Sequence, residues 1–278
     1  MGNVSCIADI DNVQTDLNTI YQWSNSNNMC FNADKFECLC YGYSEELKQN
    51  TCYLSNNKCP IEVKTSVKDL GVLMSSTAEF SEHISSTALS ANLKAGWVLR
   101  TFRTRYPVLM LALWKSLILP IIDYCCQLWS PSAVGQIQLL EDVQKSYINK
   151  IHGMSHLNYW EQLSRLKLFS LQRRRERYII LYVWKTIENI VPNFGINTRV
   201  NPRTGRFCVV PHVRSAAPAR VQSLRFASLS INGPRLFNAM PKYIRNIHGC
   251  AANAFKTLLD NYLKSVPDEP KSNQTYLE

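Results

Sequence analysis

The sequence predicts an α+β protein that is mostly helical, and three features of its pattern support this class. Before residue 75, apolar and polar residues alternate in short runs with the period of a β-strand. From Glu79 to about residue 190, apolar residues recur at helical spacing instead. Beyond that point prolines, glycines and arginines interrupt both patterns. We therefore expect three parts: a small β-hairpin region over 1–76, a helical bundle over 77–191, and a basic, irregular, Pro-rich segment over 192–278.

The first part should contain one helix and several short strands. Residues 13–25 carry apolar side chains along one stripe of a helix. Residues 61–67 alternate apolar and polar types, which is typical of a half-buried strand. We expect this strand to form a hairpin with residues 51–54. Further strands are expected at 36–41 and 70–74.

The second part should be a bundle of helices, at 80–103, 107–127, 134–152, 158–166 and 169–190. Pro107 suits the first turn of its helix, because the amide hydrogen that proline lacks would be unpaired there. Pro120 should bend the same helix, because its ring clashes with the preceding turn.

The last part should be irregular over 192–233, with a short strand at Phe207–Val210, because five prolines fall in or beside it. Two short helices should follow at 234–247 and 251–264, and residues 266–278 should form a mobile polar tail. Six arginines make the irregular stretch basic: Arg199, Arg203, Arg206, Arg214, Arg220 and Arg225.

The composition is typical of a globular protein that works inside the cell. Apolar residues make up 46% of the 278 residues, which suffices for a buried core. No apolar run is long enough for a membrane span, and the first residues do not form a signal peptide. We therefore expect a nuclear or cytoplasmic protein. Disulfides are not expected in a long chain without a signal peptide, and no zinc site is expected because the ten cysteines include no CxxC pair.

Charge is distributed unevenly along the chain. Residues 1–70 carry a net charge of −4 and residues 71–278 carry +14, which together give the overall +10. A basic region of this size favours a polyanion such as nucleic acid, because each neutralised phosphate releases condensed counterions. The alternative is that the charge only keeps the protein soluble, which requires far less of it.

Three motifs follow one another between Leu113 and Lys145. They are Pro120–Cys125 (PIIDYC), Trp129–Pro131 (WSP) and Leu140–Lys145 (LEDVQK). This order resembles the region after the catalytic palm in reverse transcriptases of LINE-type (non-LTR) retrotransposons of the jockey kind.

The resemblance continues on both sides and spans about Asp16 to Leu263. Its further pieces are Leu17–Lys35, Val67–Val72, Phe80–Ile84, Arg173–Arg175, Phe237–Pro241 and Phe255–Lys256. The resemblance implies that Leu70 and Gly71 belong to a primer-grip-like strand and that Lys35 derives from a site near the incoming nucleotide. Because the rest of that site is missing, we favour a solvated role for Lys35. The resemblance thus implies that residues 1–76 are a remnant of the palm with primer-grip-like strands, and that residues 77–191 form a thumb-like region.

The resemblance also implies what this chain lacks. The family's polymerase holds two Mg²⁺ ions with an Asp on an earlier strand and an Ala-Asp-Asp hairpin, and neither is present. Asp9 and Asp11 form a close acidic pair, but they suit the start of a helix, where acids favour the dipole. No Walker loop, GxGxxG, HExxH or GxSxG is present. We therefore expect no catalytic residue, no cofactor and no polymerase activity.

Two basic clusters are the candidate nucleic-acid-binding residues. The first comprises Lys94, Arg100, Arg103 and Arg105. The second comprises Arg173, Arg174, Arg175 and Arg177. At 100° per residue the second cluster covers most of a helix circumference, so some of its members must face inward partners. A solvated basic turn paired with local acids such as Glu176 is the alternative for it. Five tryptophans are expected in the core: Trp97, Trp114, Trp129, Trp160 and Trp184.

The sequence thus predicts a truncated RNA-directed DNA polymerase fragment that retains only sequence-tolerant binding of RNA or an RNA/DNA duplex. The alternative is a fragment that acts as a protein-interaction module, or one that has no function. Salt dependence separates them, since phosphate contacts weaken steeply with salt and apolar contacts do not.

Overall fold

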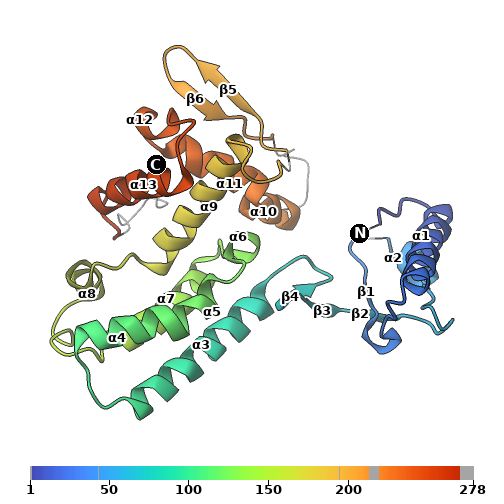
Figure 1. Cartoon of the computed structure of the whole chain (residues 1–278), viewed down its shortest axis with the longest axis horizontal. Helices are drawn as coiled ribbons and strands as arrows, with labels where there is room; N and C mark the ends of the chain where they lie inside the picture. Colours follow the sequence, from blue (N-terminus) through green and yellow to red (C-terminus); the bar gives the residue numbers. More distant parts are fainter. Residues whose placement is uncertain (1, 43, 194, 213–218, 270–278) are drawn as a thin grey trace. The chain divides into compact units, whose positions relative to one another are not determined.

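The computed structural model describes residues 2–42, 44–193, 195–212 and 219–269 (Figure 1). Within these residues the protein is α+β and mostly helical, as the sequence predicts. The chain divides into two compact units, Met1–His83 and Ile84–Glu278.

The first unit begins with helix α1 (Ile7–Ser26), which starts earlier than its apolar stripe suggests. The start is fixed by Asp9, whose carboxylate accepts hydrogen bonds from the amides of Ser5 (2.7 Å) and Cys6 (3.0 Å). These bonds hold the pKa of Asp9 below its usual value. Asp9 is therefore a first-turn residue of a helix, as the sequence predicts.

The strands of the first unit pair differently from the prediction. β1 (Glu37–Leu39) pairs in parallel with β2 (Glu62–Lys64). The expected hairpin of 51–54 with 61–67 is reduced to an antiparallel bridge between Leu54 and Pro60, flanked by backbone bonds from Ile61 to Tyr53 and from Ser55 to Cys59. A short helix, α2 (Glu45–Asn50), was not expected. Ile10, Tyr53 and Ile61 form a small core that holds α1 against this sheet.

A true hairpin lies further on, between β3 (Ser66–Asp69) and β4 (Val72–Ser75). Its two-residue tip consists of Leu70 and Gly71, and both have positive φ. Two-residue hairpin turns of the primed type require positive φ at their central positions, which suits glycine and strains leucine. All strands described before residue 76 lie between 37 and 75, and none is described from 76 to 193, as the change of sequence period predicts.

The second unit contains most of α3 (Ser81–Thr101) and then a series of shorter helices: α4 (Pro107–Leu113), α5 (Leu119–Asp123), α6 (Cys126–Trp129), α7 (Val134–Ile148), α8 (Tyr159–Leu166) and α9 (Leu171–Ile187). Pro107 opens α4 as predicted. The single helix expected over 107–127 is broken. A π-helical turn at Trp114–Ile118 precedes Pro120, and its wider spacing is one way in which a helix accommodates a missing amide hydrogen.

Helix α9 is the centre of the second unit, and α6, α7, α11 and α13 all pack against it (Figure 1). Ile180, Val183 and Trp184 on α9 are fully buried. The Trp184 ring stacks on that of Phe255 with 4.3 Å between centroids. A helix surrounded on most sides buries its polar residues together with its apolar ones, and these buried polar residues include the arginines near its start.

The irregular segment expected at 192–233 is more ordered than predicted. It contains a hairpin of β5 (Thr198–Asn201) and β6 (Gly205–Cys208), then α10 (Ala219–Ala227). Arg214 lies outside the described residues. The helix expected at 234 begins earlier, as α11 (Leu229–Ala239), with Pro234 inside it. The hydrogen of Gly233 permits close packing, since a Cβ there would lie 2.8 Å from the Val183 side chain on α9.

Two helices close the described chain, α12 (Lys242–Arg245) and α13 (Ala252–Ser265). Residues 266–269 of the expected mobile tail are placed against α9 by Pro267 and Asp268, and residues 270–278 lie outside the described part. None of the helices described is both long and apolar enough to cross a membrane.

Candidate nucleic-acid interface

Three members of the first basic cluster are exposed at the C-terminal end of α3. Lys94 and Arg100 lie on the helix, and Arg103 follows its last turn. Among the described residues, neither Arg100 nor Arg103 forms an ion pair with an acid. Exposed cations without acidic partners can accept phosphate contacts without first breaking an internal pair.

Trp97 lies beside these cations, and its expected place in the core is wrong. Its side chain is 46% exposed, whereas Trp114, Trp129 and Trp184 are buried as predicted and Trp160 is half-buried. The Lys94 ammonium nitrogen is 5.3 Å from the Trp97 ring centroid, and Phe102 packs edge-on at 6.5 Å. The exposed end of α3 therefore combines positive charge with an exposed aromatic ring. We call Lys94, Trp97, Arg100 and Arg103 the α3 cluster.

Arg105 does not belong to this surface. Its guanidinium folds back and donates to the carbonyl of Leu99 (2.7 Å) and to that of Phe102. The last carbonyls of a helix have no partner within the helix, so Arg105 satisfies the end of α3. Its role in the structure is that of a helix cap, and it is half-buried.

The second basic cluster is turned inward. Arg173, Arg175 and Arg177 are buried in α9, and only Arg174 is partly exposed. The inference that some of these residues face inward partners is confirmed. The alternative of a solvated turn is wrong, because the helix is enclosed and its acid partners come mainly from distant segments.

Each of the three ion pairs joins α9 to another part of the second unit. Arg174 pairs with Asp123 at the end of α5 (2.7 Å), and Tyr178 donates to the same carboxylate (3.2 Å). Arg177 binds both carboxylate oxygens of Asp260 on α13. A third pair, 3.6 Å long, joins Arg173 to Asp268. Sequence reasoning missed Asp260 and Asp268, because they lie more than eighty residues from their arginines and no local pattern marks them.

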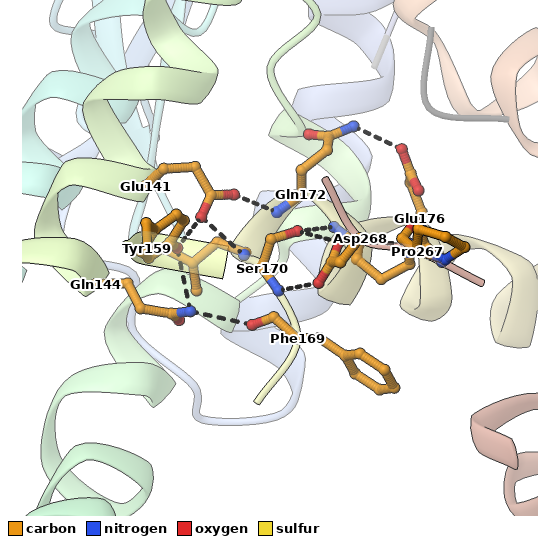
Figure 2. Close-up of polar contacts among 11 residues, drawn as sticks. Glu141, Gln144, Tyr159, Phe169, Ser170, Gln172, Glu176, Pro267 and Asp268 are labelled. Carbon is orange, nitrogen blue, oxygen red and sulfur yellow. Dashed lines mark hydrogen bonds and ion pairs between the residues drawn. The ribbon is translucent and has the colours of Figure 1, made fainter. Parts of the chain in front are cut away.

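Glu141 of α7 ties the start of α9 to α8. Its carboxylate accepts hydrogen bonds from the Tyr159 hydroxyl (2.6 Å) and from the amides of Leu171 (3.1 Å) and Gln172 (2.7 Å), as Figure 2 shows in part. Both amides belong to the first turn of α9, where amide hydrogens have no partner within the helix. A carboxylate from another helix thus caps α9 and complements the positive end of its dipole.

Gln144, one turn further along α7, extends this connection. Its side-chain amide donates to the Phe169 carbonyl (3.0 Å) and to the Tyr159 hydroxyl (3.3 Å) (Figure 2). Leu140 and Val143 are fully buried. The LEDVQK motif therefore divides into two apolar residues that enter the core and two polar ones that fasten α8 and α9.

Burial dominates the ionisation of the carboxyl groups in this network. Burial raises the pKa of Glu141, against the hydrogen bond from Tyr159 and the two amides. It also raises the pKa of Asp123, which the Arg174 guanidinium opposes. Burial raises the pKa of Glu176 to about 7, although Gln172 donates to one of its oxygens (2.9 Å). The network is a structural clamp in which Asp123, Glu141 and Glu176 are costly to ionise.

The remaining motif positions, Lys35, Leu70 and Gly71, belong to the first unit and are exposed. Lys35 is exposed at the end of a short 3₁₀ turn, Ala33–Lys35, as expected for a solvated lysine. Leu70 is 83% exposed at the tip of the β3–β4 hairpin, with φ of 44°. Gly71 follows it with φ of 88°. An exposed leucine in the left-handed region is unfavourable for stability.

No group of three His, Cys, Asp or Glu side chains in the described part of the chain could hold a metal ion. An open groove lies between α7 and α8, lined by polar side chains such as Asp142, Lys145 and Asn149.

The chain is similar over 134 residues to an uncharacterized protein of Caenorhabditis elegans, with 28% identity. The match covers 47% of this chain and 66% of the worm protein, just under two thirds of its length. No family model and no solved structure matches the chain.

Proposed function

We propose that this protein binds RNA or an RNA/DNA duplex, without sequence preference, through the α3 cluster. The main support is that Lys94, Arg100 and Arg103 are exposed together near one end of α3. The exposed ring of Trp97 lies beside them. Phosphates are bound by point charges of this kind, and such contacts carry no sequence information.

The second basic cluster no longer supports the proposal. Arg173, Arg175 and Arg177 are buried, so a phosphate could reach them only if α9 were opened. Arg105 is excluded as well, because replacing it would uncap α3. The binding experiment therefore changes Arg100 and Arg103 only.

The test compares two variants with the same loss of charge. Arg100→Gln/Arg103→Gln should weaken binding of unrelated RNA sequences equally. It should also flatten the slope of log affinity against log salt by about 0.7–0.9 for each lost phosphate contact. The matched control is Arg199→Gln/Arg203→Gln, which removes two exposed arginines from the β5–β6 hairpin.

Fluorescence anisotropy over a salt series, with circular dichroism to establish folding, provides the measurement. An unchanged slope in the α3 variant would reject this site. If only the control variant lost RNA affinity, the nucleic-acid interface would be assigned to the basic C-terminal segment instead.

We further propose that the protein derives from the C-terminal part of a LINE-type reverse transcriptase, comprising the end of the palm, the thumb and the following extension, and is itself not a polymerase. The motifs that carry the resemblance contribute residues to one network, since Asp123 pairs with Arg174 and Glu141 caps α9. This is what motifs of a single folded unit would do. Upstream genomic DNA that encodes an in-frame Ala-Asp-Asp run would identify the missing palm.

A protein-interaction module is the second candidate, favoured by one observation. Leu89, Leu93 and Trp97 recur every four residues on α3 and are 61%, 64% and 46% exposed. Such a stripe suits an apolar partner helix. An apolar partner would bind with little dependence on salt, so the salt series separates the two candidates.

A further inference from the structure

The start of α9 meets the end of the described chain in a small polar site (Figure 2). The Asp268 carboxylate accepts hydrogen bonds from the Ser170 amide (2.6 Å) and the Ser170 hydroxyl (2.8 Å). Arg173 donates to the neighbouring Pro267 carbonyl (2.7 Å), and its Nε lies 3.6 Å from the carboxylate. An acidic side chain from residues 266–269 is thus seated at the N-terminus of a long helix.

The buried Arg173 side chain requires an anion with several acceptor atoms at this site. Arg173 is 1% exposed, and its Nε and Nη1 have no hydrogen-bond partner among the described residues. A buried guanidinium is tolerated only when a charge of opposite sign and further acceptors surround it. Asp268 supplies the charge, but its two oxygens leave two donors of Arg173 without an acceptor.

A tetrahedral oxyanion fits these donors better than a carboxylate does. It presents more acceptor oxygens, and the helix dipole favours an anion at this position. The amide that it would meet is that of Ser170, because Glu141 already accepts from the amides of Leu171 and Gln172. The Asp268 side chain is 19% exposed, so its position borders solvent rather than the interior.

We propose that the N-terminus of α9 is an oxyanion-binding site, which the protein fills with its own Asp268 and which accepts a phosphate group when residues 266–269 move away. The phosphate is either free in solution or part of a nucleic-acid backbone. The proposal does not depend on the α3 cluster.

Two nearby acids oppose a second anion. The Glu141 carboxylate already accepts hydrogen bonds from the Leu171 and Gln172 amides at the start of α9. Glu176 lies on the same helix, and Asp268 is among the charges that influence it. Ionised Glu176 would repel phosphate, so the test belongs at about pH 6, where a carboxyl with pKa of about 7 is mostly neutral.

The test is rescue of Asp268→Ala by inorganic phosphate, followed as the melting temperature in phosphate and in chloride of equal ionic strength. Phosphate should raise the melting temperature of this variant by several degrees more than that of the wild type, in which Asp268 occupies the site. Phosphate also stabilises proteins in general, by exclusion from their surfaces, so matched variants are required.

Two controls isolate the site. Asp260→Ala also deprives a buried arginine, Arg177, of its acid, but away from a helix N-terminus, and should respond no more than the wild type. Asp268→Ala/Arg173→Met should lose the extra response. An equal response of Asp260→Ala and Asp268→Ala, or a response retained without Arg173, would overturn the proposal.

If Asp268→Ala does not fold, Asp268→Asn replaces it, because the amide keeps one acceptor for Ser170. Folding of either variant in phosphate but not in chloride, without such a difference for Asp260→Ala, supports the site, and an equal difference for both or none for either rejects it. A short RNA, added at the same concentration of phosphate groups, tests whether the site prefers a nucleic-acid backbone phosphate or free phosphate. Extra stabilisation by RNA that requires Arg173 indicates a backbone phosphate, and rescue by inorganic phosphate alone indicates a free anion.

Discussion

The pairing of Arg177 with Asp260 provides the sharpest test of whether the second basic cluster is structural. Asp260→Ala leaves the buried Arg177 guanidinium without its carboxylate. Removing one partner of a buried ion pair costs about 3–5 kcal/mol, because an uncompensated charge remains in the interior. The Asp260 side chain is 27% exposed, so water reaches it in part and we expect the lower end, about 3 kcal/mol.

The expected loss is readily measured. For a unit of this size it corresponds to a fall of about 6–12 °C in melting temperature. The urea midpoint, followed by circular dichroism, should shift in the same direction. Asp142→Ala removes an exposed acid from α7 and should change stability by less than about 0.5 kcal/mol.

A double variant separates charge from packing. Arg177→Met/Asp260→Leu removes both charges, and it should be close to the wild type in stability, because a buried pair rarely outperforms apolar residues of similar volume. If Asp260→Ala were as stable as the control while Arg177→Gln weakened RNA binding, Arg177 would be a phosphate contact and the structural interpretation would be refuted.

Three further predictions concern ionisation, the hairpin and activity. Burial raises the pKa of Glu176 from 4.5 to about 7, so the wild type should lose stability as pH rises through that interval, by about 3 kcal/mol. Glu176→Gln should remove this loss in urea midpoints between pH 5 and 8, and an unchanged pH profile would contradict it. Leu70→Asn should stabilise the hairpin by about 1 kcal/mol, since asparagine tolerates positive φ better than leucine; a lower urea midpoint would argue against strain at this turn. Finally, the purified protein should extend no primed RNA with Mg²⁺ or Mn²⁺, and extension that persists through repurification would show that it is an active polymerase.

The spacing of apolar residues in the sequence predicted helices and strands well where one face of the element is buried. The change from strand to helix spacing after residue 75 matches the end of β4 and the start of α3. It failed at the β1–β2 pair, because alternation reports that a strand is half-buried and says nothing about its partner. It also failed at 192–233, where Pro and Arg suggested irregular chain and the structure has a hairpin and a helix.

The α3 cluster illustrates a mixed outcome. The sequence correctly grouped Lys94, Arg100 and Arg103, since neighbouring residues on one helix end remain neighbours in the fold. It placed Trp97 in the core, because an aromatic residue among leucines usually belongs there. Burial depends on which face of α3 meets the rest of the unit, and the stripe that contains Trp97 faces solvent.

The sequence by itself determined the class of fold, the extent of most helices and the concentration of positive charge in the later part of the chain. These properties are local, and they follow from residue type and spacing. Only the tertiary structure decided which charges are available to a ligand. Arg173 to Arg177 resemble a binding cluster when read along the chain, yet Asp123, Asp260 and Asp268 neutralise three of them from distant segments. The physical reason is that an ion pair depends on distance in space, and the fold of the second unit around α9 sets that distance.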